Sequence, residues 1–156
     1  MDVVRIVDAA MADAVVKGGA WVVCRPGCTS CCFGAFEITI EDAARLREGL
    51  SRLDRSRAAQ ILDRAAKYGD GSGQGDDDPC PVLNPATGLC ELYEHRPLLC
   101  RTFGPATRIG SSIGVCHLCF EGASDAEIVA AAVEIAPEVF DSAEHLTVAQ
   151  ALINRE

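Results

Sequence analysis

Cysteine thiols are the side chains of this chain whose number and spacing indicate chemistry. The 156 residues hold nine of them. Four fall in the short stretch Cys24-Arg-Pro-Gly-Cys28-Thr-Ser-Cys31-Cys32, and the others are Cys80, Cys90, Cys100, Cys116 and Cys119. Thiolates are soft ligands that prefer zinc, ferrous iron or an iron–sulfur cluster to magnesium or calcium. The sequence therefore predicts a metal-binding protein, with all nine cysteines as candidate ligands.

The spacing of the cysteines supports metal binding but leaves their grouping open. Cys28 and Cys31 form a Cys-x-x-Cys step, and so do Cys116 and Cys119. Such a step lets one tight turn present two sulfurs to a tetrahedral ion. We expect cysteines from both halves of the chain to converge on one or two metal centres. Spacing alone does not assign cysteines to these centres, and it fits both zinc and an iron–sulfur cluster.

Other polar side chains accompany the cysteines. His95 and His117 are candidate ligands, although a position beside the site is the simpler interpretation of an isolated histidine. His145 is expected to be exposed on a terminal helix. Three arginines sit beside cysteines in the sequence: Arg25, Arg96 and Arg101. Their expected role is to offset thiolate charge and to hydrogen-bond locally.

Disulfide bonding is the main alternative use of so many cysteines. The count is odd, and Cys31 and Cys32 are neighbours, which can hardly bond to each other without strain. The first residues, Met1-Asp2-Val3-Val4-Arg5, lack the basic start and apolar run of an export signal. Disulfides persist in oxidising compartments. We therefore expect a cytoplasmic protein whose thiols bind metal.

Composition narrows the classes of partner. The formal net charge is −9, which argues against nucleic acid or an anionic membrane surface. No apolar run approaches the ~20 residues that span a bilayer. No serine-hydrolase elbow, zinc-protease helix or dinucleotide-binding fingerprint occurs, so the sequence leaves enzymatic activity open. A metal ion or cluster is the only partner that the sequence indicates.

Periodicity and turn signals predict a mainly α fold. We expect a small single domain over residues 1–156, with an irregular cysteine-rich metal-binding segment and one short hairpin. The expected elements are helices over 2–17, 40–49, 55–68, 124–135 and 147–154, an extended lead-in over 20–23, a short strand over 36–40, a short helix from Pro97, and a hairpin over 108–115. A flexible loop is expected at about 69–79. Charges on the 55–68 helix, Arg57 and Arg64 among them, are interpreted as a solvated face.

The cysteine pattern resembles the YkgJ-like cysteine-cluster family. The resemblance is carried by Cys24-x3-Cys28-x2-Cys31-Cys32, by Cys80-Pro-x-Leu, and by Gly88-x-Cys90-x-Leu-Tyr93-Glu-x-Arg96-Pro97-x-x-Cys100-Arg101-x-Phe103. The family's usual opening, Cys-x2-Cys-x2-Cys-Cys, has two residues in the first gap, and this chain has three. By resemblance, the ligands are Cys28, Cys31, Cys32, Cys80, Cys90 and Cys100, with Cys116 and Cys119 completing the set.

The resemblance implies a zinc- or iron-chelating domain. A similar cluster in bacterial flagellin lysine methylases is thought to hold iron and sulfur, so the implied cofactor is an iron–sulfur cluster, zinc or iron. Three roles stay open for the metal: a structural staple, a cargo that the protein chelates, or a redox-active group in an electron-transfer protein or a modifying enzyme.

Overall fold

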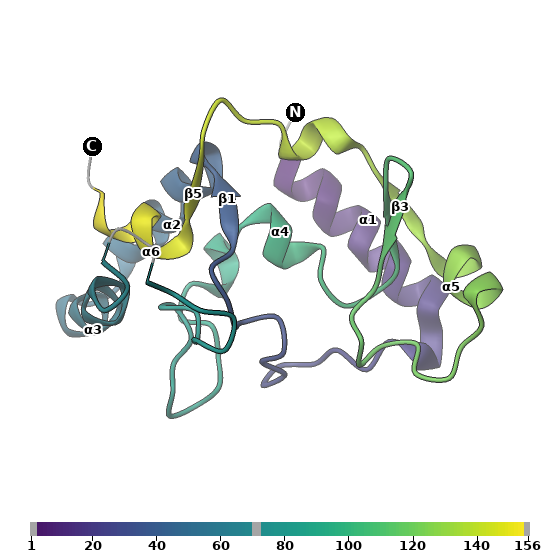
Figure 1. Ribbon diagram of the computed structural model, residues 1–156, viewed down its shortest axis with the longest axis horizontal. Helices are drawn as coiled ribbons and strands as arrows, with labels where there is room; N and C mark the ends of the chain where they lie inside the picture. Colours follow the sequence, from purple (N-terminus) through teal and green to yellow (C-terminus); the bar gives the residue numbers. More distant parts are fainter. Residues whose placement is uncertain (1–2, 70–72, 155–156) are drawn as a thin grey trace. The chain divides into compact units, whose positions relative to one another are not determined.

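The computed structural model describes residues 3–69 and 73–154, which fall into two compact units (Figure 1). Unit 1 is Met1–Pro26 with Leu98–Asp141, and unit 2 is Gly27–Pro97 with Ser142–Glu156. Each unit is therefore built from two separate stretches of chain. The single domain expected over residues 1–156 stays a prediction. No helix in the described ranges is long and apolar enough to cross a membrane.

Unit 1 combines helices with a three-stranded sheet. Its elements are α1 (Val3–Gly18), η1 (Gly19–Trp21), α4 (Leu98–Arg101), β2 (Thr107–Ile109), β3 (Ser112–Gly114), α5 (Asp125–Ala131), β4 (Val133–Ile135) and η3 (Pro137–Phe140). The strand order is β3-β2-β4: β3 pairs antiparallel to β2, and β4 pairs parallel to it. Ser124 and Glu127 form a capping box that starts α5.

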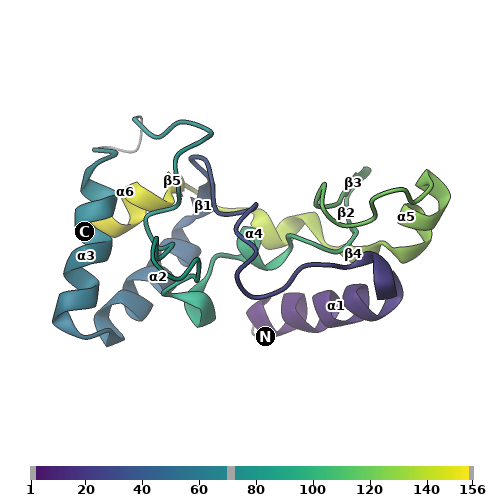
Figure 2. The same cartoon turned by 90° about the horizontal axis from the view of Figure 1, so that it is seen from below.

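Two apolar clusters hold unit 1 together. Val7, Met11 and Ala14 repeat at helical spacing along α1 and form its buried stripe. They pack with Leu98, Val133 and Ile135. A smaller cluster joins Ala106, Cys119, Phe120 and Ala131. Seen from below in Figure 2, α1 runs along the sheet that β4 belongs to.

Unit 2 is built on two strand-to-helix steps of the same kind. Its elements are β1 (Glu37–Thr39), α2 (Ile40–Arg52), α3 (Arg55–Ala66), η2 (Tyr93–His95), β5 (His145–Thr147) and α6 (Val148–Ile153). β1 and β5 pair antiparallel, with Ile38 opposite Leu146. Each strand ends in a threonine, Thr39 or Thr147, whose hydroxyl accepts a backbone N–H and caps the next helix. This places α2 and α6 side by side on one core.

The core of unit 2 lies where α6 packs against both α2 and α3. Its largest fully buried side chains include Ile38, Leu46, Ile61 and Leu152. Two residues from the cysteine-rich loop, Val82 and Leu92, are buried in the same cluster at 2% and 3% exposure. The loop is thus anchored to the helices by apolar side chains.

The structure agrees with the sequence predictions in its mainly α character and in several elements. These are the helices over 3–18, 40–52 and 55–66, the 107–114 hairpin and the short helix after Pro97. The helix expected over 124–135 is wrong beyond Ala131: Val133 and Ile135 alternate with exposed Glu134 and join the sheet as β4. The lead-in over 20–23 is extended only from Val22, because η1 occupies Gly19–Trp21. His145 is exposed as expected, but on β5. Part of the expected flexible loop, residues 70–72, lies outside the described residues.

Candidate metal centre

Five of the cysteines belong to unit 2: Cys28, Cys31, Cys32, Cys80 and Cys90. The other four belong to unit 1: Cys24, Cys100, Cys116 and Cys119. The boundary between the units falls after Pro26 and so divides the first cysteine stretch. Cys28, Cys31, Cys32, Cys80, Cys90, Cys116 and Cys119 are free thiols in the described chain.

A short antiparallel pairing brings Cys32 beside Cys80. The Cys80 amide donates to the Cys32 carbonyl oxygen at 2.7 Å, and the Gly34 amide donates to the Asp78 carbonyl oxygen at 2.9 Å. Between these bonds, Phe33 and Pro79 stand opposite each other. The Cys32 amide itself closes a turn onto the Thr29 carbonyl oxygen at 2.8 Å. Two cysteines almost fifty residues apart in sequence therefore share one ladder.

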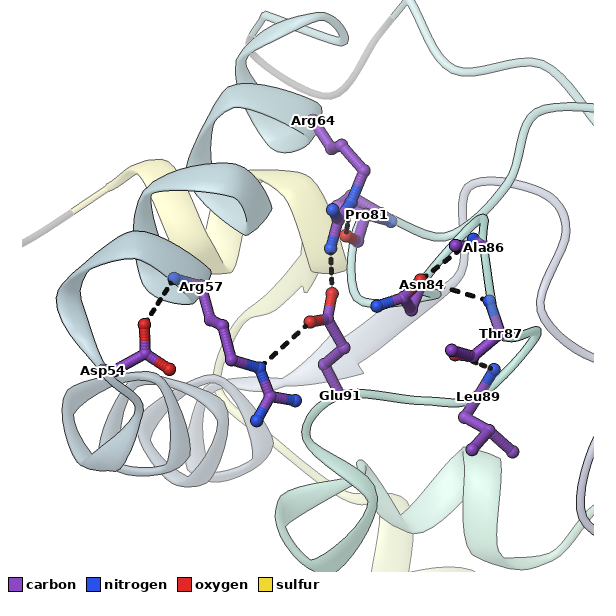
Figure 3. A network of polar contacts seen from close by, with 9 residues as sticks. All are labelled: Asp54, Arg57, Arg64, Pro81, Asn84, Ala86, Thr87, Leu89 and Glu91. Carbon is purple, nitrogen blue, oxygen red and sulfur yellow. Dashed lines mark hydrogen bonds and ion pairs between the residues drawn. The ribbon is translucent and has the colours of Figure 1, made fainter.

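A second pairing brings Cys90 back to the residues that follow Cys80. Cys90 stands opposite Leu83, and the Glu91 amide donates to the Val82 carbonyl oxygen at 2.9 Å. The connecting loop is closed by Asn84, whose side-chain oxygen accepts from the Ala86 and Thr87 amides (Figure 3). This asparagine turn reverses the chain between Cys80 and Cys90 and so lets the two cysteines approach each other.

Gly88 completes the loop and lets the first cysteine stretch approach it. Its φ of +67° is a left-handed conformation that favours glycine. A Cβ on Gly88 would lie 3.6 Å from the Thr29 methyl and 3.9 Å from the Gly27 carbonyl oxygen. The segment that carries Cys28 therefore lies against the loop that leads to Cys90.

Backbone amides act on two of the sulfurs. The Val82 and Leu83 amides favour the Cys80 thiolate and the Leu92 amide favours the Cys90 thiolate, while the Leu83 amide also donates to the Cys80 carbonyl oxygen at 2.9 Å. These amides lower the pKa of each cysteine, whereas burial, the larger effect, raises it. The result is a pKa of about 12 for Cys80 and a raised pKa for Cys90. Both thiols therefore hold their protons at neutral pH.

Cys31 and Cys32 behave as a coupled pair. The Cys32 thiol hydrogen-bonds to the Cys31 sulfur, which lowers the pKa of Cys31 to about 6. The same bond raises the pKa of Cys32 above its ordinary value, and burial and the charges of Cys31, Cys80 and Cys90 raise it further. The four sulfurs are therefore close enough to act on one another's ionisation. Cys31 is the one that is ionised at neutral pH.

Arg96 supplies positive charge to this group of thiols. Its charge lowers the pKa of both Cys31 and Cys90. The guanidinium carbon lies 3.9 Å from the centre of the Tyr93 ring, and one Nη donates to the Tyr93 carbonyl oxygen at 3.0 Å. The role expected for Arg96, offsetting thiolate charge, agrees with this placement.

In unit 1, the cysteines lie in a different setting. Gly104, with φ +110°, makes room for Cys24: a Cβ there would stand 3.2 Å from the Cys24 Cβ and 3.4 Å from its sulfur. The Cys116 amide donates to the Gly104 carbonyl oxygen at 3.1 Å, so Cys24 and Cys116 approach the same backbone. Cys119 is 4% exposed and packs among apolar side chains. Cys100 lies on α4, next to Arg101.

A family model described as "CxxCxxCC: Putative zinc- or iron-chelating domain" matches residues 23–122. The chain belongs to this CxxCxxCC family. The matched range holds all nine cysteines, so the family resemblance stated from the cysteine pattern is confirmed. No curated protein and no solved structure matches the chain.

The thiols of unit 2 suit the metals that the CxxCxxCC description names, because zinc and iron both accept four cysteine sulfurs. Across residues 3–69 and 73–154, no three Cys, His, Asp or Glu side chains already stand as a metal-binding group. Ligation in unit 2 would therefore require the sulfurs to turn towards a common point. The nine-cysteine ligand set stays a prediction.

The two histidines that were candidate ligands belong to different units. His95 packs on α2: a Cβ on Gly49 would lie 2.6 Å from the His95 ring, so glycine is needed there. His117 is exposed in unit 1. Arg25 is exposed, whereas Arg101 is buried and bonds both oxygens of Asp8, at 2.9 and 2.7 Å.

Sequence reasoning missed two charged residues of this CxxCxxCC domain that hold the cysteine loop. Arg64 was expected on a solvated helix face, but its side chain is only 20% exposed and contacts Pro81 and Glu91. Glu91 is 3% exposed. The one available signal was that Glu91 directly follows a cysteine and precedes a buried leucine.

Proposed function

We propose that this protein binds zinc or iron, and that the thiolates of Cys31, Cys32, Cys80 and Cys90 are the core of its metal site. The observation that carries the proposal is that two short backbone pairings in unit 2 bring Cys32 beside Cys80 and bring Cys90 back to the residues that follow Cys80. Membership of a family described as zinc- or iron-chelating gives independent support.

The electrostatics of the site favour a cation. Burial raises the pKa of Cys80 and Cys90, and hydrogen bonding and burial raise that of Cys32. A bound metal ion deprotonates a coordinating thiol outright, so metal binding would overcome the effect of burial on the pKa values of these cysteines. Arg96 and the amides of Val82, Leu83 and Leu92 are already placed to stabilise the resulting thiolates.

An iron–sulfur cluster is the group that we propose for the native protein, with zinc taken up after aerobic overexpression. Either group takes about four thiolates. Cys31 and Cys32 are adjacent, so their side chains approach a metal from different directions, which suits different atoms of a cluster. Cys28, three residues before Cys31, offers a further thiolate.

Anaerobic purification followed by metal analysis, acid-labile sulfide assay and a visible spectrum tests this proposal. We expect a brown protein that contains iron and sulfide. A colourless anaerobic preparation with stoichiometric zinc and no sulfide would reject the iron–sulfur cluster and retain metal binding. Absence of both metals, with all thiols reduced, would reject the proposed function itself.

A role beyond structural stapling is the second part of the proposal. Structural zinc sites are closed and fully ligated, whereas functional sites keep a position open. Cys31 and Cys32 are partly exposed, and the helices of unit 2 have an apolar core of their own. We therefore infer a metal that is exchanged or redox-active, with an intact helical core when the metal is absent.

A further inference from the structure

The segments that begin at Cys80 and Cys90 are built alike. In each, the residue two positions after the cysteine, Val82 or Leu92, is buried in the unit 2 core. The amide of that same residue favours the thiolate form of the cysteine. The intervening residue, Pro81 or Glu91, presents an oxygen atom towards α3. The segments Cys80–Val82 and Cys90–Leu92 thus share the pattern Cys-x-apolar and lie opposite each other across the loop.

Arg64 contacts both of these cysteine segments. Arg64 on α3 donates its Nε hydrogen to the Pro81 carbonyl oxygen at 2.7 Å, and an Nη group bonds the Glu91 carboxylate (Figure 3). A planar guanidinium fixes the angle between its donors, so it sets the separation of the two oxygens that it binds. Those oxygens belong to the residues that directly follow Cys80 and Cys90.

The surroundings make this contact strong. The Glu91 side chain is 3% exposed and that of Arg64 is 20% exposed, so water competes little for either group. Glu91 also contacts Arg57, but at 3.5 Å and from a side chain that is 51% exposed. Arg57 is therefore a matched comparison: the same residue type, on the same helix, contacting the same carboxylate without reaching Pro81.

We propose that Arg64 is a positioning residue that sets the spacing of Cys80 and Cys90 for metal binding; this inference rests on the proposed function of the unit 2 thiols. Arg64 acts through Pro81 and Glu91 and touches no sulfur. Through these two contacts it holds the backbone that directly follows Cys80 and the side chain that directly follows Cys90. The structure thus assigns to α3 a part in the metal site that the cysteine motif does not contain.

The test compares Arg64→Lys, Arg64→Ala and Arg57→Ala in the full chain. Reduced, metal-free protein is titrated anaerobically with Co²⁺ against a competing chelator, and the thiolate-to-cobalt absorption reports affinity and geometry. We expect both Arg64 variants to lose about 10- to 100-fold in affinity, the range typical of residues that orient metal ligands. Lysine should fail because it offers a single point donor. Arg57→Ala should stay within a few-fold of the wild type.

Amide hydrogen exchange of the metal-free variants gives a readout that does not depend on metal. Without Arg64, the Glu91 amide, which bonds Val82, should exchange faster, while amides in α2 and α6 keep their protection. Two results would overturn the proposal: wild-type affinity and spectrum in Arg64→Ala, or equal losses in Arg57→Ala and Arg64→Ala. If the wild type binds no metal, the proposed function fails, and unchanged exchange at Glu91 would reject the positioning role separately.

Discussion

Replacing the cysteines one at a time by serine tests which thiols bind metal. Serine keeps the size of the side chain but offers a hydroxyl in place of a soft thiolate. We expect Cys31→Ser, Cys32→Ser, Cys80→Ser and Cys90→Ser each to weaken binding of the first equivalent of metal. Cys116→Ser is the matched control, because Cys116 is also a partly exposed thiol but belongs to unit 1.

The size of the effect follows from the number of thiols in the site. Structural zinc sites bind with about 10–16 kcal/mol, so four thiolates contribute about 2.5–4 kcal/mol each. A tenfold change in affinity corresponds to about 1.4 kcal/mol, which gives a loss of roughly 60- to 700-fold per cysteine.

The assay is anaerobic competition for Zn²⁺ with a chromophoric chelator, and far-UV circular dichroism of the metal-free variants checks that the helices are kept. Losses confined to the four unit 2 variants would support the assignment. A loss in Cys116→Ser equal to that in Cys80→Ser would refute it, and so would unchanged affinity in any two of the four.

Three further predictions concern the metal-free protein. Removing the metal with a chelator should leave the circular dichroism signal of α2, α3 and α6 nearly unchanged, since these helices share an apolar core. Amide exchange should become faster only over 28–34 and 75–92. A cooperative loss of helix would contradict this prediction. In the reduced protein, iodoacetamide should alkylate Cys31 first, because its lowered pKa makes it a thiolate above about pH 6. The alkylation rate plotted against pH should have its midpoint near pH 6. Cys32→Ala, which removes the thiol donor, should move this midpoint to higher pH, and an unchanged midpoint would show that Cys32 is not the cause. Gly104→Ala should destabilise unit 1 by about 1–3 kcal/mol in urea unfolding, because an alanine at φ +110° is strained and its Cβ would stand 3.2 Å from the Cys24 Cβ. Gly122→Ala, at φ +81° with open space around it, is the control: it shares the strain without the crowding and should cost less. An equal effect of the two substitutions would show that crowding against Cys24 contributes nothing.

Local signals in the sequence were sufficient for the helices of both units. Thr39, Asp54 and Ser124 each cap the helix that follows, as their residue types predict. The strands were harder to predict, because their partners lie far away in the chain. β5 pairs with β1 across more than a hundred residues, and β4 replaces the end of an expected helix. Nothing within either segment encodes those partners.

For the metal site, the sequence indicated the ligand type but not the grouping. Cys28 and Cys31 form the Cys-x-x-Cys step that the sequence shows, yet the thiols whose pKa values are raised by the charge of Cys31 are Cys32, Cys80 and Cys90. Arg64 was interpreted as a solvated charge, because a charge on a helix is normally exposed. Its burial depends on Glu91, a residue that reaches α3 only after the loop has folded.

The two sides of the proposed site differ in how firmly they are held. Cys80 and Cys90 are each followed by a core residue, Val82 or Leu92, and both segments are bound by Arg64. After Cys32 comes Phe33, which is 39% exposed, so the Cys31–Cys32 turn has no core side chain there and is held through the backbone pairing at Cys32 and Gly34. Since cores are close-packed and transmit strain, shifting the 80–92 side disturbs the core, whereas residues 28–31, which precede the paired Cys32, can move without disturbing it. Closure around a metal is therefore expected to proceed by movement of the turn towards a fixed pair of cysteines.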